Sequence, residues 1–185
     1  MRTAVVELES VSPYSQSRFH ETAKIERELA DAYEARTWKQ RLHRDAKGMV
    51  FIPPMSLKNC LAEAAKYMGI QIPGKGKSNY TKHFEAGILI FEPIELGIHA
   101  DDVNGEWLFL DSNGKKGSGT RVKRCYPRID HWSGTALIHV LDEIITEDVL
   151  LKHLEAAGSF IGMGRFRPRN GCFYGRFKVN SLSWK

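Results

Sequence analysis

Apolar and polar residues alternate in some parts of the chain and follow a helical period in others. Residues 3–11 alternate, which predicts a strand. In the segment 56–68 apolar residues recur at i, i+3, i+4, i+7, i+8 and i+11, the spacing of an amphipathic helix. Ser56 is placed to cap that helix at its N-terminus, and Gly69 to end it.

The later part of the chain also contains segments with the strand pattern and segments with the helix pattern. Residues 87–98 are apolar and β-branched, and predict a strand that bends or lies at an edge because Pro93 interrupts it. In an extended conformation, residues 134–145 place mainly apolar side chains on both faces, which predicts a buried strand. We expect a helix over 146–161, capped by Thr146, and a final strand over 172–183.

The order of these elements indicates the fold class. Strand, helix, strand, strand, helix, strand is the ferredoxin-like βαββαβ order, which the RNA-recognition motif shares. We therefore expect an α+β protein with an antiparallel sheet, both helices on one face, and the other face free to bind.

Two segments fall outside this order, and we treat them as insertions into a single domain over residues 1–185. Residues 21–47 are rich in charge and helix formers with weak apolar spacing, which predicts a helical insertion. Residues 111–128 begin DSNGKKGSGT and predict a flexible, basic, glycine-rich loop.

Charge is segregated along the chain. The 27 basic residues outnumber the 22 acidic ones, for a net charge of +5. Three stretches, residues 74–82, 115–128 and 165–178, contain 14 of the basic residues and no acid. The rest of the chain is therefore acidic, and such segregation favours an anionic partner more strongly than the net charge does.

Composition and motifs argue against several classes of protein. Cys60, Cys125 and Cys172 lie far apart without a CxxC pair, so we expect neither a disulfide framework nor a cysteine zinc site. With no HExxH, P-loop, dinucleotide fingerprint or GxSxG, we expect neither a metal nor a cofactor. The short apolar runs and the charged N-terminus predict a cytoplasmic protein without a membrane partner.

The segment after the second predicted helix resembles a family signature. Met163-Gly164 opens it, a basic stretch follows, and Gly171 to Gly175 closes it. A loop of this composition between the second helix and the last strand of a ferredoxin-like fold resembles the RAMP superfamily, although its closing glycines stand one residue further apart than usual. These are the guide-RNA-binding and guide-processing proteins of CRISPR effector systems, and the Pro-Pro-Met-Ser entry to the first helix resembles their backbone subunits. As a compact single-domain member, the protein would also fit a phage or mobile element.

The chemistry of this loop suits single-stranded nucleic acid. Glycines allow backbone amides to approach a phosphate, and the predicted nest consists of Gly162, Gly164 and Gly171. In an extended segment alternating arginines project to one side, where they can bind phosphates while nearby aromatic rings stack on bases. The predicted binding residues of this region are Arg165, Phe166, Arg167, Arg169, Tyr174 and Arg176. The second basic stretch adds Lys115, Lys116, Arg121, Lys123 and Arg124.

Catalysis is a less favoured alternative. Metal-free RNA cleavage needs a base, an acid and a cation, which Tyr80, Lys82 and His83 together could supply. His20 with Tyr14 is a second such pair, although each of these residues is also common on ordinary surfaces.

These patterns together predict a non-catalytic RAMP-type protein that binds single-stranded RNA, or single-stranded DNA, and that assembles as a homo-oligomer or within a ribonucleoprotein. Two alternatives remain. One is a metal-independent endoribonuclease of the same fold, and the other is a protein-binding module that imitates a RAMP subunit and docks on a CRISPR complex.

Overall fold

A four-stranded antiparallel sheet forms the centre of the molecule. The computed structural model describes residues 1–112, 117 and 119–185. The sheet has the order β4 (Ile88–Leu89), β8 (Ser133–Val140), β1 (Arg2–Ser10), β9 (Phe177–Trp184), with antiparallel neighbours throughout. In chain order this is second, third, first and fourth strand, which is the predicted ferredoxin-like arrangement.

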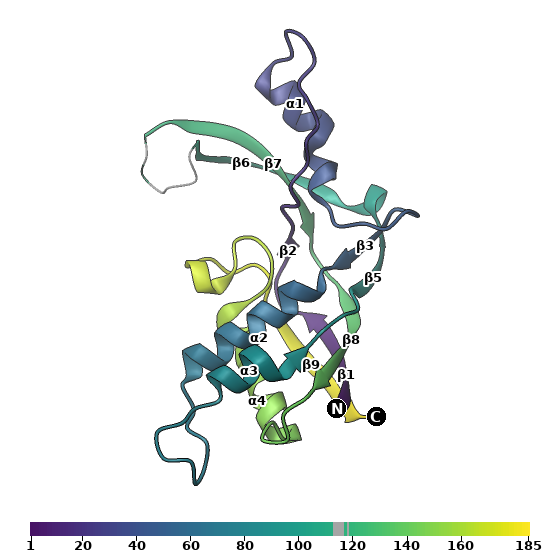
Figure 1. Ribbon diagram of the computed structural model, residues 1–185. Coiled ribbons are helices and arrows are strands. Elements are labelled where there is room, and N and C mark those ends of the chain that lie inside the picture. Colours follow the sequence, from purple (N-terminus) through teal and green to yellow (C-terminus); the bar gives the residue numbers. More distant parts are fainter. Residues whose placement is uncertain (113–116, 118) are drawn as a thin grey trace.

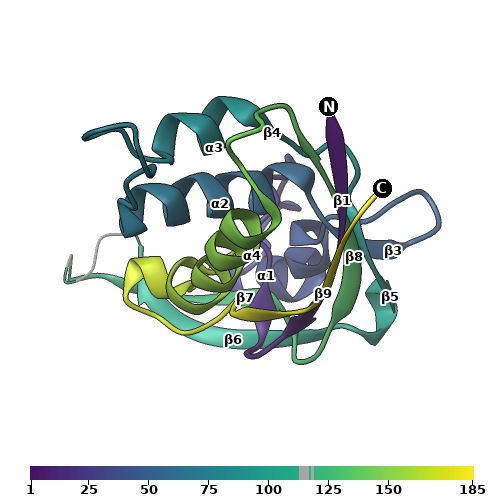
Figure 2. The ribbon, with the colours of Figure 1, turned by 90° about the horizontal axis from the view of Figure 1, so that it is seen from below.

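Three helices cover one face of this sheet (Figures 1 and 2). They are α2 (Pro54–Met68), α3 (Thr81–Gly87) and α4 (Glu147–Ala156), and a π-helical turn η3 (Ala157–Ile161) continues α4. Helix α2 buries the apolar stripe expected from its period, Leu57, Cys60, Leu61, Ala64 and Ala65. These residues pack on the inward-facing Ala4, Val6 and Leu8 of β1.

Helix ends follow local chemistry with one exception. The Thr146 hydroxyl accepts a hydrogen bond from the Val149 amide at 3.4 Å, so Thr146 caps α4 as predicted. Gly69 ends α2 in the left-handed conformation, with φ 58°. Ser56, however, is not the N-cap. Helix α2 begins two residues earlier at Pro54, because a proline suits the first turn, where its missing N–H costs no hydrogen bond.

The predicted strand over 87–98 is two strands in different sheets. Helix α3, which the sequence did not predict, ends at Gly87 and leads into β4, whereas β5 (Ile94–His99) pairs with β3 (Met49–Ile52). Pro93 lies between them, and its lack of an N–H favours the end of one ladder before the next begins.

A long hairpin projects from the sheet (Figure 1). It consists of β6 (Asn104–Asp111) and β7 (Arg121–Ile129), and β2 (Tyr14–Ser15) adds to β7. The prediction of a loop over 111–128 is therefore wrong from residue 121 onward. Residues 121–128 of β7 pair with β6, an interaction between distant segments that the run of bases concealed.

The insertion before β3 is helical only in part. Helix α1 (Ala30–Thr37) and the 3₁₀ turn η1 (Trp38–Arg41) form its second half, whereas residues 21–29 adopt no regular secondary structure. A helix without an apolar stripe gains little from packing, so it persists only where β7 supports it. Two further 3₁₀ turns are η2 (Ala100–Asp102) and η4 (Pro168–Asn170).

The two ends of the chain lie side by side, since β1 pairs with β9 (Figures 1 and 2). Within the described residues, the helices are too short or too polar to cross a membrane.

Candidate nucleic-acid interface

The glycine-rich loop between η3 and β9 is packed closely onto the rest of the chain. Gly164 and Gly175 have φ of 73° and 74°. A Cβ atom on Gly175 would lie 1.8 Å from the Met163 carbonyl oxygen, and one on Gly164 would lie 2.4 Å from the Ser15 carbonyl oxygen. Only glycine fits these positions, so the loop has a defined path against β2.

The loop amides do not form the predicted nest. The N–H of Gly162 donates to the Ala157 carbonyl at 2.8 Å, and that of Gly171 donates to the Pro168 carbonyl at 2.9 Å. Both amides are therefore used within the loop, and the prediction is wrong for these two residues. Gly164 remains at the surface, where it lines two of the hollows described below.

The three loop arginines do not share one side, as the prediction of an extended segment required. Phe166 has a left-handed φ of 55°, and η4 follows at once, so the chain turns between successive arginines. Arg165 turns to the hairpin, Arg167 turns to α2, and Arg169 is exposed on η4. Arg167 is held by Glu63 through contacts of 3.1 and 3.2 Å.

Arg165 is a desolvated cation without a counter-charge. Its Cζ lies 3.4 Å from the centroid of the Tyr126 ring and 4.5 Å from that of Phe166. The Nε atom is buried, and among the described residues neither a hydrogen-bond acceptor nor a carboxylate pairs with it. Burial lowers the pKa of Arg165 from its usual value, so an anion in front of this guanidinium would be strongly favoured.

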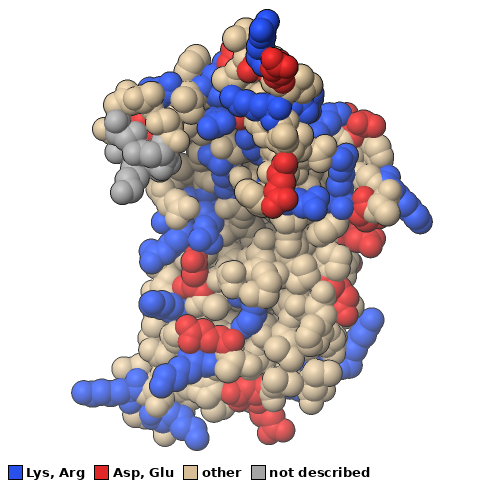
Figure 3. Space-filling model, turned by 45° about the horizontal axis from the view of Figure 1, so that its top comes forward, with Lys and Arg blue, Asp and Glu red and all other residues tan. Residues whose placement is uncertain are grey.

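A groove of about 900 Å³ lies in front of Arg165. Its walls come from the hairpin, from residues 17–20, from Tyr33 of α1 and Arg41 of η1, and from the glycine-rich loop. Four arginines line it against one acid, Asp111, together with aromatic side chains. The arginines are Arg18, Arg41, Arg124 and Arg165, and the aromatic residues are Phe19, Tyr33, Tyr126 and Phe166. Lys and Arg side chains gather over this part of the surface in Figure 3.

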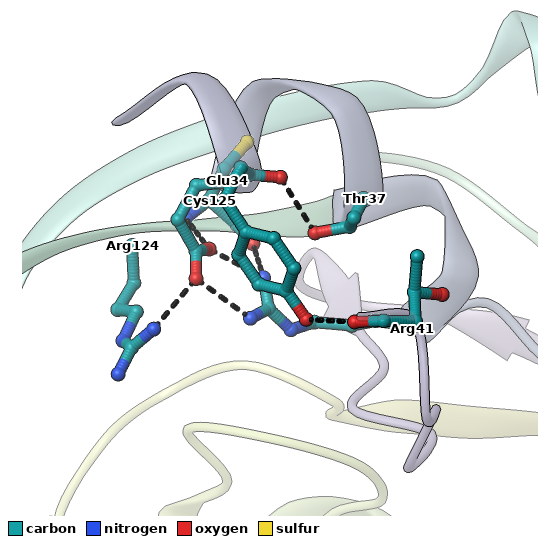
Figure 4. Close-up of polar contacts among 7 residues, drawn as sticks. Glu34, Thr37, Arg41, Arg124 and Cys125 are labelled. Atoms are coloured by element: carbon teal, nitrogen blue, oxygen red, sulfur yellow. Dashed lines mark hydrogen bonds and ion pairs between the residues drawn. The ribbon is translucent and has the colours of Figure 1, made fainter. Parts of the chain in front are cut away.

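One buried carboxylate holds two of these arginines in place. Glu34 of α1, only 1% exposed, accepts hydrogen bonds from Arg41 at 2.7 Å, Arg124 at 2.7 Å and the Cys125 amide at 3.1 Å (Figure 4). Arg41 also donates to the Cys125 carbonyl. Glu34 and Arg41 thus occupy the place of a neighbouring strand at the open edge of β7, and they attach the insertion to the hairpin.

Two smaller hollows continue the groove along the glycine-rich loop. A connecting hollow of about 420 Å³ shares Ser17, Arg165, Phe166 and Asn170 with the groove. The next, which we call the α2 hollow, measures about 460 Å³ and shares Ser56, Gly164 and Arg167 with the connecting one. The lining residues thus form one continuous surface from the hairpin to helix α2.

The remaining predicted binding residues lie elsewhere or are already engaged. Tyr174 is buried, and its hydroxyl donates to Glu106 at 2.8 Å, so its ring is not available for stacking. Arg176 donates to the Ser159 carbonyl at 2.8 Å. Arg121 and Lys123 stand on the face of β7 opposite to Arg124, and Lys123 pairs with Asp31 at 3.4 Å. Lys115 and Lys116 lie outside the described residues.

The proposed catalytic residues do not converge. Tyr80 is buried against the His153 ring, whereas His83 faces Asp142 with Nδ1 and Oδ2 2.5 Å apart, and Lys82 is exposed. Consecutive positions around the start of α3 point in different directions, so the closeness of these residues in sequence is misleading. His20 lines the groove, but Tyr14 is buried, and burial raises its pKa to about 12. In the described part of the chain no three His, Cys, Asp or Glu residues are grouped as metal ligands.

The uncovered face of the main sheet differs from an RNA-recognition surface. Glu7 of β1 is exposed there between Thr135 of β8 and Ser181 of β9, and Val5 and Leu137 are the next pair along. Base stacking on such a sheet requires exposed aromatic residues on its central strands. His139 of β8 lies on this face, but its side chain is 14% exposed and packs against the Phe91 ring. The expectation that this face binds is therefore not supported, and the basic groove lies to one side of it.

Sequence reasoning missed Arg18, Arg41 and Tyr126 as groove residues. Arg18-Phe19-His20 combines a base with aromatic rings, which is a usable signal, although these residues lie between the predicted elements and were assigned to none. Tyr126 stands within a basic stretch already singled out, but its partner Arg165 is distant in sequence.

Comparison with known proteins places the fold. No protein-family model matches the chain, and no curated protein matches it by sequence. By structure it is similar to the type III-B Cmr-beta bound to cognate target RNA, with a TM-score of 0.57 and 13% identity over 99% of this chain and 60% of that one. It is also similar to Cmr6 from Pyrococcus furiosus, with a TM-score of 0.51 and 10% identity over 96% of this chain and 97% of that one. The chain thus spans 60% of the length of the first of these structures, which is less than two thirds. Together with the strand order, these similarities show that the chain shares its fold with these two Cmr structures.

Proposed function

We propose that this protein binds single-stranded RNA in the groove between the β6–β7 hairpin and the glycine-rich loop, as a non-catalytic component of a ribonucleoprotein. The observation that carries the proposal is Arg165, a half-buried guanidinium without a counter-charge that opens onto a groove lined by three more arginines. A phosphate at this point would supply the missing negative charge.

The aromatic lining of the groove supports a single strand as the occupant. Phe19 is 81% exposed at the groove edge, and unpaired bases stack on such rings without regard to sequence. One of the two structural neighbours, the type III-B Cmr-beta, supplies a precedent, since its structure was determined with cognate target RNA bound.

The test is anisotropy with a labelled single-stranded RNA across a range of salt concentrations, comparing the wild type with Arg165→Ala. Removing one phosphate contact is expected to weaken binding on the order of tenfold and to reduce the salt slope by about 0.7. Lys178→Ala is the matched control, because Lys178 is an exposed cation near the loop that pairs with Glu9 outside the groove.

The outcomes are distinct. No binding by the wild type at low salt would refute the proposal and favour a protein-docking role. Equal losses in Arg165→Ala and Lys178→Ala would refute the assignment to the groove. A parallel titration with DNA of the same sequence decides which nucleic acid is preferred.

A further inference from the structure

The α2 hollow differs in chemistry from the groove that it adjoins. It is lined by two cations, Lys66 and Arg167, and by two acids, Glu63 and Glu85, so its charges balance. The groove has four arginines against one lining acid. A phosphate is favoured in the groove, whereas beside Glu63 and Glu85 it would meet like charge.

The side chains that line the α2 hollow form an ordered polar array. Ser56, Asn59, Glu63 and Lys66 are spaced i, i+3, i+7 and i+10 along α2, and therefore share one side of the helix. Glu85 of α3 completes the array. Glu63 and Arg167 hold each other in a two-point ion pair, which leaves the exposed Asn59 amide and Glu85 carboxylate for a ligand.

We propose that the α2 hollow reads a nucleobase of the bound strand and favours bases that carry an exocyclic amino group. This inference rests on the proposed function, because it takes the RNA to be anchored by its phosphates in the groove. A carboxylate accepts a hydrogen bond from the N4 amino group of cytosine, and an asparagine amide complements bases through one donor and one acceptor. Uracil has a carbonyl oxygen where cytosine has its amino group, so it would face Glu85 with an acceptor.

The path between the two sites is open and continuous. Gly164, Arg167 and Ser56 line both the α2 hollow and the connecting hollow, and Arg165 lines both the connecting hollow and the groove. Gly164 is exposed at the boundary between the two hollows. A strand with its phosphates at Arg165 can therefore turn the base of a neighbouring nucleotide toward α2.

The experiment compares labelled oligocytidine and oligouridine of equal length by anisotropy at neutral pH. The wild type is expected to bind oligocytidine at least about fivefold more tightly. Asn59→Ala and Glu85→Ala are expected to bring the two affinities together without changing the salt slope. Both residues are exposed, so these variants should fold. Arg165→Ala should instead weaken both RNAs, flatten the salt slope and keep the preference for cytidine.

Three results would overturn the inference. Equal affinities for the two RNAs in the wild type contradict base reading, and so does a cytidine preference that both α2-hollow variants retain. A preference lost in Arg165→Ala but kept in Glu85→Ala would assign base reading to the groove. If neither RNA binds at all, the proposed function itself fails, which is a separate and recognisable outcome.

Discussion

Glu34 shows how much one buried residue contributes to this architecture. Its carboxylate joins α1, η1 and β7 through Arg41, Arg124 and the Cys125 amide. Burial by itself would raise the pKa of Glu34, but the hydrogen bonds from these three groups outweigh it and lower the pKa from 4.5 to about 2. This network is the polar part of the attachment between the insertion and the hairpin, and it lies beside an apolar contact in which Trp38 packs against Gly105 of β6.

We expect Glu34→Gln to destabilise the fold on the order of 3 kcal/mol at neutral pH, because two arginines lose their shared negative charge and one of the two accepting oxygens becomes an N–H donor. Urea denaturation followed by circular dichroism measures the change. Glu26→Gln is the control, since the Glu26 side chain is 89% exposed. A loss no greater than that of the control would contradict the role given to Glu34.

The same residue predicts a pH dependence. Because the pKa of Glu34 is lower in the folded state, its contribution is complete above about pH 4.5 and is lost as the pH falls toward 2. The difference in free energy of unfolding between the wild type and Glu34→Gln should therefore shrink as the pH is lowered from 6 to 3. A difference that stays constant over this range would show that the carboxylate charge is not what stabilises the contact.

At the scale of elements, the glycine-rich loop has a composition typical of flexible segments, but close packing fixes the course of its backbone. Gly171 and Gly175 both have positive φ, 77° and 74°, but they differ in surroundings. A Cβ atom on Gly171 would meet nothing within 4 Å, whereas one on Gly175 would collide with the Met163 backbone. The two positions therefore separate the cost of backbone strain from the cost of steric exclusion.

Gly171→Ala is expected to cost on the order of 1 kcal/mol, and Gly175→Ala on the order of 3 kcal/mol or more. Thermal or urea unfolding of the two variants measures both values. Gly175→Ala should also weaken RNA binding, because displacement of the loop moves Arg165. Equal costs at the two positions would contradict the packing described for Gly175.

The periodicity of apolar residues predicted the helices and strands of the core. It failed for elements that form only through contacts with distant segments of the chain. Helices α2 and α4 and strands β1, β8 and β9 each bury one stripe or face, so their period is visible in sequence. Strand β7 carries Arg121, Lys123 and Arg124, which predicted a loop, and it becomes a strand because its residues 121–128 pair with β6. Helix α1 shows no apolar stripe, and ion pairs hold it in place.

At the scale of the whole molecule, the proposed RNA-binding groove lies to one side of the main sheet rather than on its uncovered face. Hydrogen–deuterium exchange with and without RNA tests this assignment. Amides around residues 16–20 and 162–171 are expected to gain protection, while those of β1 and β9 that lie away from the groove are expected to change little. Protection centred on β1 and β8 without change in the glycine-rich loop would favour binding on the sheet face.

By itself, the sequence determined the ferredoxin-like order of strands and helices, because that order depends on local periodicity. It also identified the loop that supplies Arg165, because glycine and arginine content is visible without knowledge of any contact. Only the tertiary structure decided which cations are available for a ligand. Arg167 meets Glu63, and Arg124 meets Glu34, across roughly a hundred residues of chain. The Arg165 guanidinium instead lies on the Tyr126 and Phe166 rings, and no carboxylate in the described part of the chain pairs with it. Whether a cation is neutralised depends on the residues that folding brings next to it, and charge counted along the chain carries no information about those neighbours.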